Sequence, residues 1–131
     1  MLGYFLFRFG VEDVFYLETV ITYFAFAVNL LPLFMTKKEV FVWLKDGTKT
    51  IDVRKGKPSR GETATFMSGP NLLRLPIVKK ETGKLAEIIR PDNFKSVIPT
   101  AKTHIDALNY LQTLYQTSEG TFTAYHVSQA V

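Results

Sequence analysis

The feature that most constrains this chain is a long apolar run near its N-terminus. Residues 14–34 read VFYLETVITYFAFAVNLLPLF and carry one charge, Glu18, and the next charge along the chain is Lys37. A helix needs roughly 20 mostly apolar residues to cross a bilayer, so the run is long enough. Lys37 and Lys38 follow it directly, and this excess of cations predicts a single-pass membrane protein whose C-terminal part lies in the cytoplasm.

Small and polar residues recur in this run at helical spacing. Glu18, Thr22, Ala25 and Asn29 are separated by four, three and four residues, which places them on one side of a helix. A carboxylate, a hydroxyl and a carboxamide are costly against lipid, so such a stripe is typical of a helix–helix contact. We therefore expect a partner helix, from a second copy of this chain or from a different protein.

Three other interpretations of the run stay open. A buried helix of a soluble fold has the same composition. Residues 25–27, Ala-Phe-Ala, resemble a signal-peptide cleavage site, although the segment before them is acidic and apolar residues continue beyond them. The sequence from Met35 onward also resembles the start of a soluble protein, and this interpretation predicts a cytoplasmic protein that functionally begins at Met35.

The charge of the chain changes sign where the apolar run ends. Residues 1–34 hold one cation and three anions, whereas residues 35–131 hold fifteen Lys and Arg against nine Asp and Glu. We therefore predict an apolar helical segment over residues 1–34 and a small basic α+β domain over residues 35–131.

The chain has no cysteine, which excludes disulfides, thiolate metal sites and cysteine nucleophiles.

A first β-hairpin is predicted at the start of the basic domain. Residues 38–44 and 49–53 are rich in β-branched and aromatic residues, and the Asp46-Gly47 pair between them favours a tight turn. Ile51 and Val53 alternate with polar residues along the second strand. We expect the apolar face of this strand to pack and its polar face to meet solvent.

A second hairpin and a helix complete the predicted domain. The hairpin spans Asn71–Arg90, and Pro76 within its first arm favours an edge position or a bulge. Residues 55–70 before it read as a loop. An amphipathic pattern predicts a helix over residues 100–117, and the tail that follows fits a strand or a helical turn equally well. The predicted fold is α+β, with an N-terminal apolar helix, a small antiparallel sheet of two hairpins and a C-terminal amphipathic helix packed on the sheet.

Cationic residues gather in two of the predicted loops. They are Arg54, Lys55, Lys57, Arg60, Lys79, Lys80 and Lys84. Flexible cationic loops on a sheet contact the phosphates of nucleic acid or of anionic lipid, so these residues form the predicted polyanion-binding site. A solvated charged loop has the same pattern. Phe41, Trp43 and Phe66 are candidates for base stacking, although aromatic residues in strands are more often core.

Motifs for catalysis or metal binding are weak. His104 and Asp106 are two residues apart on the predicted helix and point in different directions, and His126 has no neighbouring carboxylate in the sequence. No nucleophile elbow, dinucleotide-binding glycine pattern or paired-carboxylate motif is present. We expect a non-enzymatic protein with no cofactor, no metal and no small-molecule substrate.

Two functions from different classes follow from this sequence. The first is a membrane-anchored accessory subunit, whose apolar helix meets a partner helix and whose basic domain docks on a protein, a lipid surface or nucleic acid. The second is a soluble basic module, beginning in effect at Met35, that contacts nucleic acid through Arg54, Lys55, Lys57 and Arg60.

Overall fold

The computed structural model describes residues 18–24 and 30–129. The chain divides into two compact units, residues 1–31 and 32–131, and each is described by itself. In the first unit, residues 18–24 form a helix whose large apolar side chains, including Tyr23 and Phe24, are exposed.

The predicted stripe of polar residues falls partly on this helix. Thr22 Oγ1 donates a hydrogen bond to the carbonyl of Glu18 at 2.9 Å, so the hydroxyl has a partner within its own helix. Ala25 and Asn29 lie outside the described residues. The helix–helix contact through these four residues stays a prediction.

The prediction of a membrane-spanning helix over residues 14–34 is wrong. In the part of the chain that the structure describes, no helix is long and apolar enough to cross a bilayer. The end of the apolar run has a different role, because Leu33–Met35 forms strand β1 and the Phe34 ring lies 5.7 Å from the Phe66 ring, centroid to centroid. The predicted single-pass topology, which depended on this helix, is therefore not supported within the described residues.

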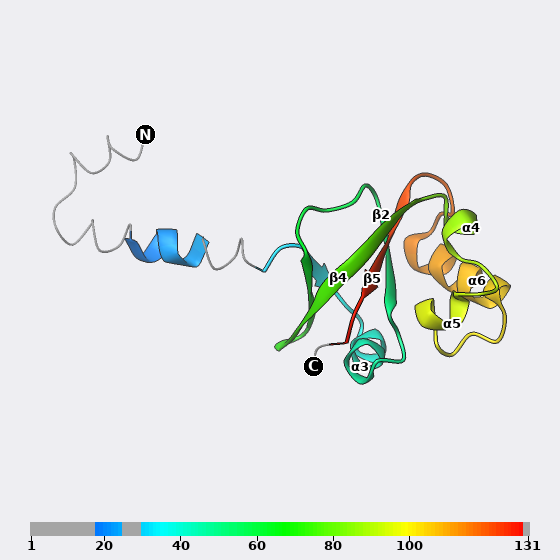
Figure 1. Cartoon of the computed structure of the whole chain (residues 1–131), viewed down its shortest axis with the longest axis horizontal. Helices are drawn as coiled ribbons and strands as arrows, with labels where there is room; N and C mark the ends of the chain where they lie inside the picture. The colour runs from blue at the N-terminus through cyan, green and yellow to red at the C-terminus, as the bar shows by residue number, and fades with distance from the viewer. Residues whose placement is uncertain (1–17, 25–29, 130–131) are drawn as a thin grey trace. The chain divides into compact units, whose positions relative to one another are not determined.

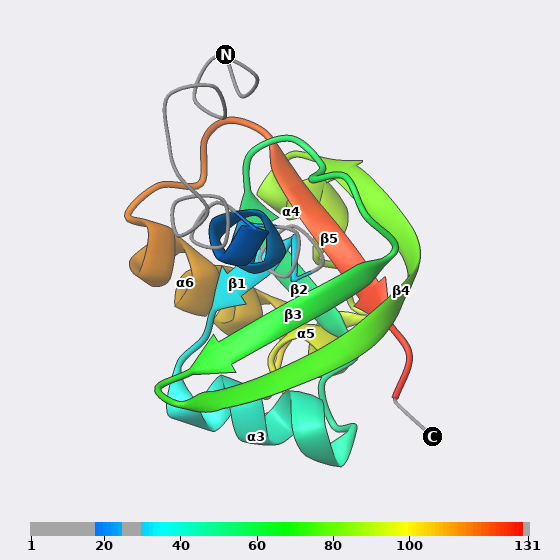
Figure 2. The ribbon, with the colours of Figure 1, turned by 90° about the vertical axis from the view of Figure 1, so that its left-hand side faces the viewer.

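Within residues 32–129, the second unit is built on a curled sheet of five strands (Figure 1). They are β1, β2 (Ile51–Lys55), β3 (Thr63–Ser68), β4 (Asn71–Gly83) and β5 (Phe122–Val127). Their order is β1-β3-β4-β5-β2, with β1 parallel to β3 and the other pairs antiparallel. The long strand β4 bends strongly (Figure 2), and the edge strands approach each other, since Arg54 Nη1 donates to the Met35 carbonyl at 2.8 Å. The predicted antiparallel sheet of two hairpins is therefore wrong.

Helices pack against this sheet in two groups. They are α3 (Lys38–Asp46), α4 (Leu85–Ile88), α5 (Phe94–Val97) and α6 (His104–Tyr115). One core, the α3 cluster, contains Val40, Phe41, Leu44, Ala64, Phe66, Leu75 and Val127. The other, the α6 cluster, contains apolar residues of α4, α5 and α6 together with Ile51, Val53, Phe122 and Ala124 of the sheet. The domain thus has two separate cores, one for each group of helices.

The first predicted strand is a helix. Residues 38–46 form α3, in which Val40, Phe41 and Leu44 are buried at positions i, i+1 and i+4 and so share one face. Packing of this face outweighed the β propensity of its aromatic and branched side chains. Gly47, predicted in a hairpin turn, instead ends the helix with φ of 84°, a left-handed conformation that favours glycine.

The second predicted hairpin is a single long strand followed by a helix. β4 continues through residues 80–83, which were predicted to turn, because these residues pair with β5. Residues 85–88, the predicted second arm, form α4 instead. The partner of the first half of β4 is β3, which lies in the predicted loop 55–70. A register shift between Ile77 and Lys79 marks a bulge close to Pro76.

The last helix and the last strand both contribute residues to the α6 cluster. α6 lies inside the predicted range 100–117, and Thr103 caps its N-terminus. Thr103 Oγ1 accepts a hydrogen bond from the Asp106 backbone N–H, and the Asp106 carboxylate accepts one from the Thr103 N–H. The tail forms β5, between β4 and β2. The C-terminal helix therefore packs on the sheet over Ile51 and Val53.

Candidate functional site

A pocket of about 170 Å³ opens between the two cores. The end of β1 and the start of α3 form one wall, β2 forms the floor, and α6 forms the opposite wall. Most of the surface area that lines the pocket is apolar, and Val40, Val53 and Leu111 contribute to it. Its polar lining consists of Thr36, Lys37, Lys49, Asp52, Arg54, Tyr110 and Tyr115. This volume is below the several hundred Å³ of a drug-sized ligand site and fits one small ring system.

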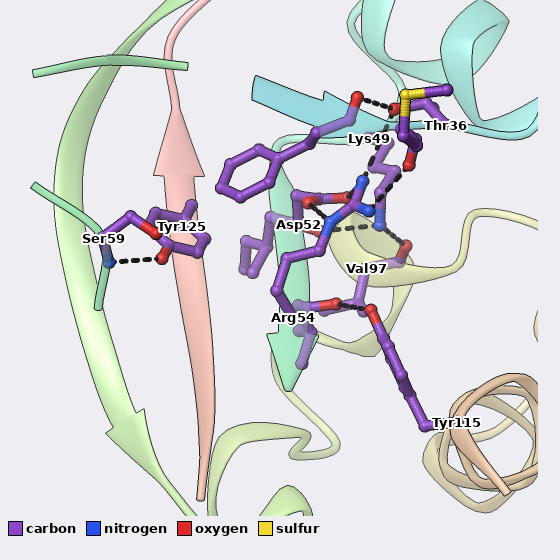
Figure 3. Close-up of polar contacts among 12 residues, drawn as sticks. Thr36, Lys49, Asp52, Arg54, Ser59, Val97, Tyr115 and Tyr125 are labelled. Carbon is purple, nitrogen blue, oxygen red and sulfur yellow. Dashed lines mark hydrogen bonds and ion pairs between the residues drawn. The ribbon is translucent and has the colours of Figure 1, made fainter. Parts of the chain in front are cut away.

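Lys49 lies at the floor of this pocket and is 3% exposed. Its Nζ donates to the carbonyls of Ile51 at 2.8 Å and of Val97 at 2.5 Å, so two of its three hydrogens are matched by the protein (Figure 3). Burial lowers the pKa of Lys49 to about 8, against the attraction of the nearby Asp52 carboxylate. A buried amine close to neutrality is therefore present at the base of the pocket.

Asp52 and Arg54 form an ion pair on one face of β2. The opposite face of this strand packs into the α6 cluster through Ile51 and Val53. Arg54 Nε lies 2.5 Å from Asp52 Oδ2, and the Asp52 side chain is 5% exposed. Arg54 also stacks on the Phe34 ring at 4.8 Å. Burial opposes the charge of Arg54, but the pull of Asp52 and its hydrogen bond dominate and raise the pKa of the guanidinium above its usual value. Arg54 therefore stays charged inside the wall of the pocket.

Two tyrosines of α6 frame the other side. Tyr115 Oη donates to the Val53 carbonyl at 2.8 Å, and its ring packs edge-on against Phe122. Burial raises the pKa of Tyr115 to about 12, so the phenol stays protonated. Tyr110 Oη donates to Glu39 Oε1 of α3 at 2.9 Å. Burial, followed by this hydrogen bond, raises the pKa of Tyr110 to about 12.

Two shallower hollows adjoin the pocket, and Lys37 lines all three. One, of about 550 Å³, lies along α6 beside Tyr110 and Asn109. The other, of about 590 Å³, lies over α3 beside Val42 and Trp43. The pocket is therefore the deep part of a wider depression that offers partly exposed aromatic rings.

The predicted polyanion residues divide between the pocket and the surface. Arg54 belongs to the pocket, whereas Lys55, Lys57 and Arg60 are exposed on the strand end and loop that follow it. This loop is held in place, because Tyr125 Oη accepts from the Ser59 N–H at 2.8 Å and Lys80 Nζ donates to the Ser59 carbonyl at 2.6 Å. The structure therefore brings Lys80 together with the first basic loop.

The other predicted cations have different surroundings. Lys79 lies 3.6 Å from Glu81, and Glu81 also pairs with Arg90 and with His126 Nε2 at 2.9 Å. Lys84 is exposed at the start of α4. His126 thus hydrogen-bonds to the carboxylate around which Lys79 and Arg90 gather. Within residues 18–24 and 30–129 no group of three His, Asp or Glu side chains could hold a metal ion.

Most residues of the pocket could not be recognised from the sequence. The polar face of β2 was expected to meet solvent, but Asp52 is buried on that face because β1 and α3 cover it. Lys37, Lys49, Tyr110 and Tyr115 were not singled out. The one available signal was the run Ile51 to Arg54, in which an aspartate and an arginine alternate with Ile51 and Val53 on one short strand. Of the predicted stacking rings, Phe41 and Phe66 are core and Trp43 is half-buried.

Comparison with known proteins supports the fold. No family model matches this chain, and no curated protein matches its sequence. The crystal structure of hypothetical protein PH0355 is similar, with a TM-score of 0.61 over 75% of this chain and 97% of that chain. Sequence identity is 11%, so the likeness concerns the fold alone.

Proposed function

We propose that the domain of residues 32–129 binds single-stranded nucleic acid, taking one unstacked base into the pocket. The observation that carries this proposal is the pocket itself, which combines apolar and aromatic walls with the buried Lys49 and Asp52 and the partly buried Arg54. Nucleobases combine a flat apolar face with a hydrogen-bonding edge, and proteins recognise unstacked bases through both.

The hydrogen-bonding capacity of the floor supports a base edge as ligand. Asp52 accepts from Arg54, yet two carboxylate oxygens have about four lone pairs, so capacity remains for a further N–H donor. Charged Lys49 has one hydrogen beyond the two given to carbonyls. The floor can therefore offer one acceptor and one donor side by side.

The basic loop supports phosphate contacts next to the pocket. Lys55, Lys57 and Arg60 are exposed and follow Arg54 directly along the chain. Residues 35–131 carry fifteen cations against nine anions, which favours a polyanion as ligand. A single strand suits this arrangement, since a base within a duplex cannot enter a pocket without leaving its stack.

The test is fluorescence anisotropy of labelled single-stranded and duplex oligonucleotides with the full chain. We expect the single strands to bind at least ten-fold more tightly than the duplexes, with affinity that falls as salt rises. Leu114→Trp fills the mouth of the pocket from a position that is 41% exposed and should abolish this preference. Leu72→Trp makes the same change on an exposed residue outside the pocket and should not. Equal binding of single strands and duplexes contradicts the proposal.

A further inference from the structure

The mouth of the pocket lies on the seam between the two cores of the domain. Val40 of α3 belongs to the α3 cluster, whereas Leu111 of α6 belongs to the α6 cluster, and both line the pocket. Each helix is thus fixed to its own core. Because the cores are separate, the width of the mouth depends on contacts that cross the seam.

One hydrogen-bonded side-chain pair crosses the seam beside the pocket: Tyr110 lines the pocket, and Glu39 lines the adjoining hollow over α3. The Tyr110 ring packs against the α6 cluster, and its Oη donates to Glu39 Oε1 on α3 at 2.9 Å. Within residues 30–129 no other hydrogen bond joins α3 to α6. Lys37 Nζ lies 5.8 Å above the centre of the same ring, which adds a cation–π contact on the α3 side.

We propose that the Tyr110–Glu39 hydrogen bond is the gate of the pocket. When it is closed, Lys49 is 3% exposed although its side chain lines the pocket. When it breaks, the start of α3 and the middle of α6 separate and a ligand reaches Lys49 from the adjoining hollows. The exposed position of the bond keeps its net strength modest, so the open state is sampled without unfolding either core.

The gate is tested in the ligand-free protein, so its outcome is independent of nucleic-acid binding. The full chain is treated with a small acylating reagent at pH 8, and the modification rate of Lys49 is measured by peptide mass spectrometry relative to exposed Lys57. Tyr110→Phe removes the hydroxyl and keeps the ring. We expect it to raise the relative rate at Lys49 about five-fold, the factor that corresponds to roughly 1 kcal/mol of hydrogen bonding. Tyr23→Phe makes the same change at an exposed tyrosine of the first unit and should leave the rate unaltered.

A double-mutant cycle decides whether the two side chains act together. Glu39→Gln should raise the rate less than Tyr110→Phe, and the double variant should match Tyr110→Phe alone. Additive effects, or an unaltered rate in Tyr110→Phe, overturn the proposal. Hydrogen exchange of β5 amides is followed in parallel, and faster exchange there also overturns it, because the opening is then global.

Discussion

Arg54 Nε lies 2.5 Å from Asp52 Oδ2, and the two residues stand on the same face of β2, where the pocket covers both. Lys49 lies beside them, so the buried Asp52 carboxylate faces two cations, of which Lys49 is buried and Arg54 is partly buried. This triad is at once a structural element and the polar floor of the proposed base site.

Asp52→Asn should destabilise the domain strongly. The substitution keeps the shape of the side chain but leaves the buried Lys49 and the partly buried Arg54 without a counter-charge, and breaking a buried pair costs about 3 kcal/mol. Urea denaturation measures the loss. Asp92→Asn removes an exposed partner of Arg90 and should cost under about 1 kcal/mol. Similar losses in the two variants contradict the buried role of Asp52.

Lys49 should make stability depend on pH. Its pKa is about 8 in the folded protein and 10.5 in the unfolded chain, so between these values the unfolded chain holds more protons and stability rises with pH. The free energy of unfolding should rise by about 2 kcal/mol by pH 10. Above that, Tyr110 and Tyr115 reverse the trend, because their folded-state pKa of about 12 makes the folded protein hold protons that the unfolded chain releases. Thermal unfolding at several pH values should show this rise in the wild type and not in Lys49→Met.

Phe34 should anchor β1. Its ring contacts Phe66, Tyr125 and Arg54, whereas Leu33 beside it is 38% exposed. We expect Phe34→Ala to cost about 2 kcal/mol and Leu33→Ala under about 0.5 kcal/mol in urea denaturation. A chain that begins at Met35 lacks Phe34 and should be destabilised at least as much as Phe34→Ala. Equal losses of unfolding free energy in Phe34→Ala and Leu33→Ala would contradict the anchoring role of Phe34 in β1.

The basic loop should set the salt dependence of binding. Lys57→Ala and Arg60→Ala should each reduce the slope of log affinity against log salt by about 0.7, the value for one phosphate contact on a single strand. Lys79→Ala should leave the slope unchanged, because the Lys79 ammonium is paired with Glu81. Anisotropy titrations between low and moderate salt measure the three slopes, and a matching drop in all three assigns the effect to overall charge.

The sequence predicted local features better than distant ones. α6 lies within the predicted helix 100–117 and β2 overlaps the predicted strand 49–53, because each is specified by its own residues. α3 was missed because aromatic and branched residues favour a strand until Val40, Phe41 and Leu44 find a common core. The parallel pairing of β1 with β3 joins segments about thirty residues apart, and a strand of three residues has almost no periodicity of its own.

The pocket was hidden from sequence for the same reason. Asp52 and Arg54 read as the solvent face of a strand, and only the curl of the sheet brings β1 over them. Tyr110 and Tyr115 join them from a helix more than fifty residues away. Sites assembled from distant segments need the topology before their residues can be recognised together.

The most direct test of the base pocket compares a short single-stranded oligonucleotide with its abasic counterpart, in which phosphates and sugars remain. Both are titrated by anisotropy against the wild type and Leu114→Trp at one salt concentration. We expect removal of the bases to weaken wild-type binding at least ten-fold and to leave binding by Leu114→Trp almost unchanged. If the wild type binds both strands equally, the pocket does not take a base, and binding rests on the charges of the loop alone.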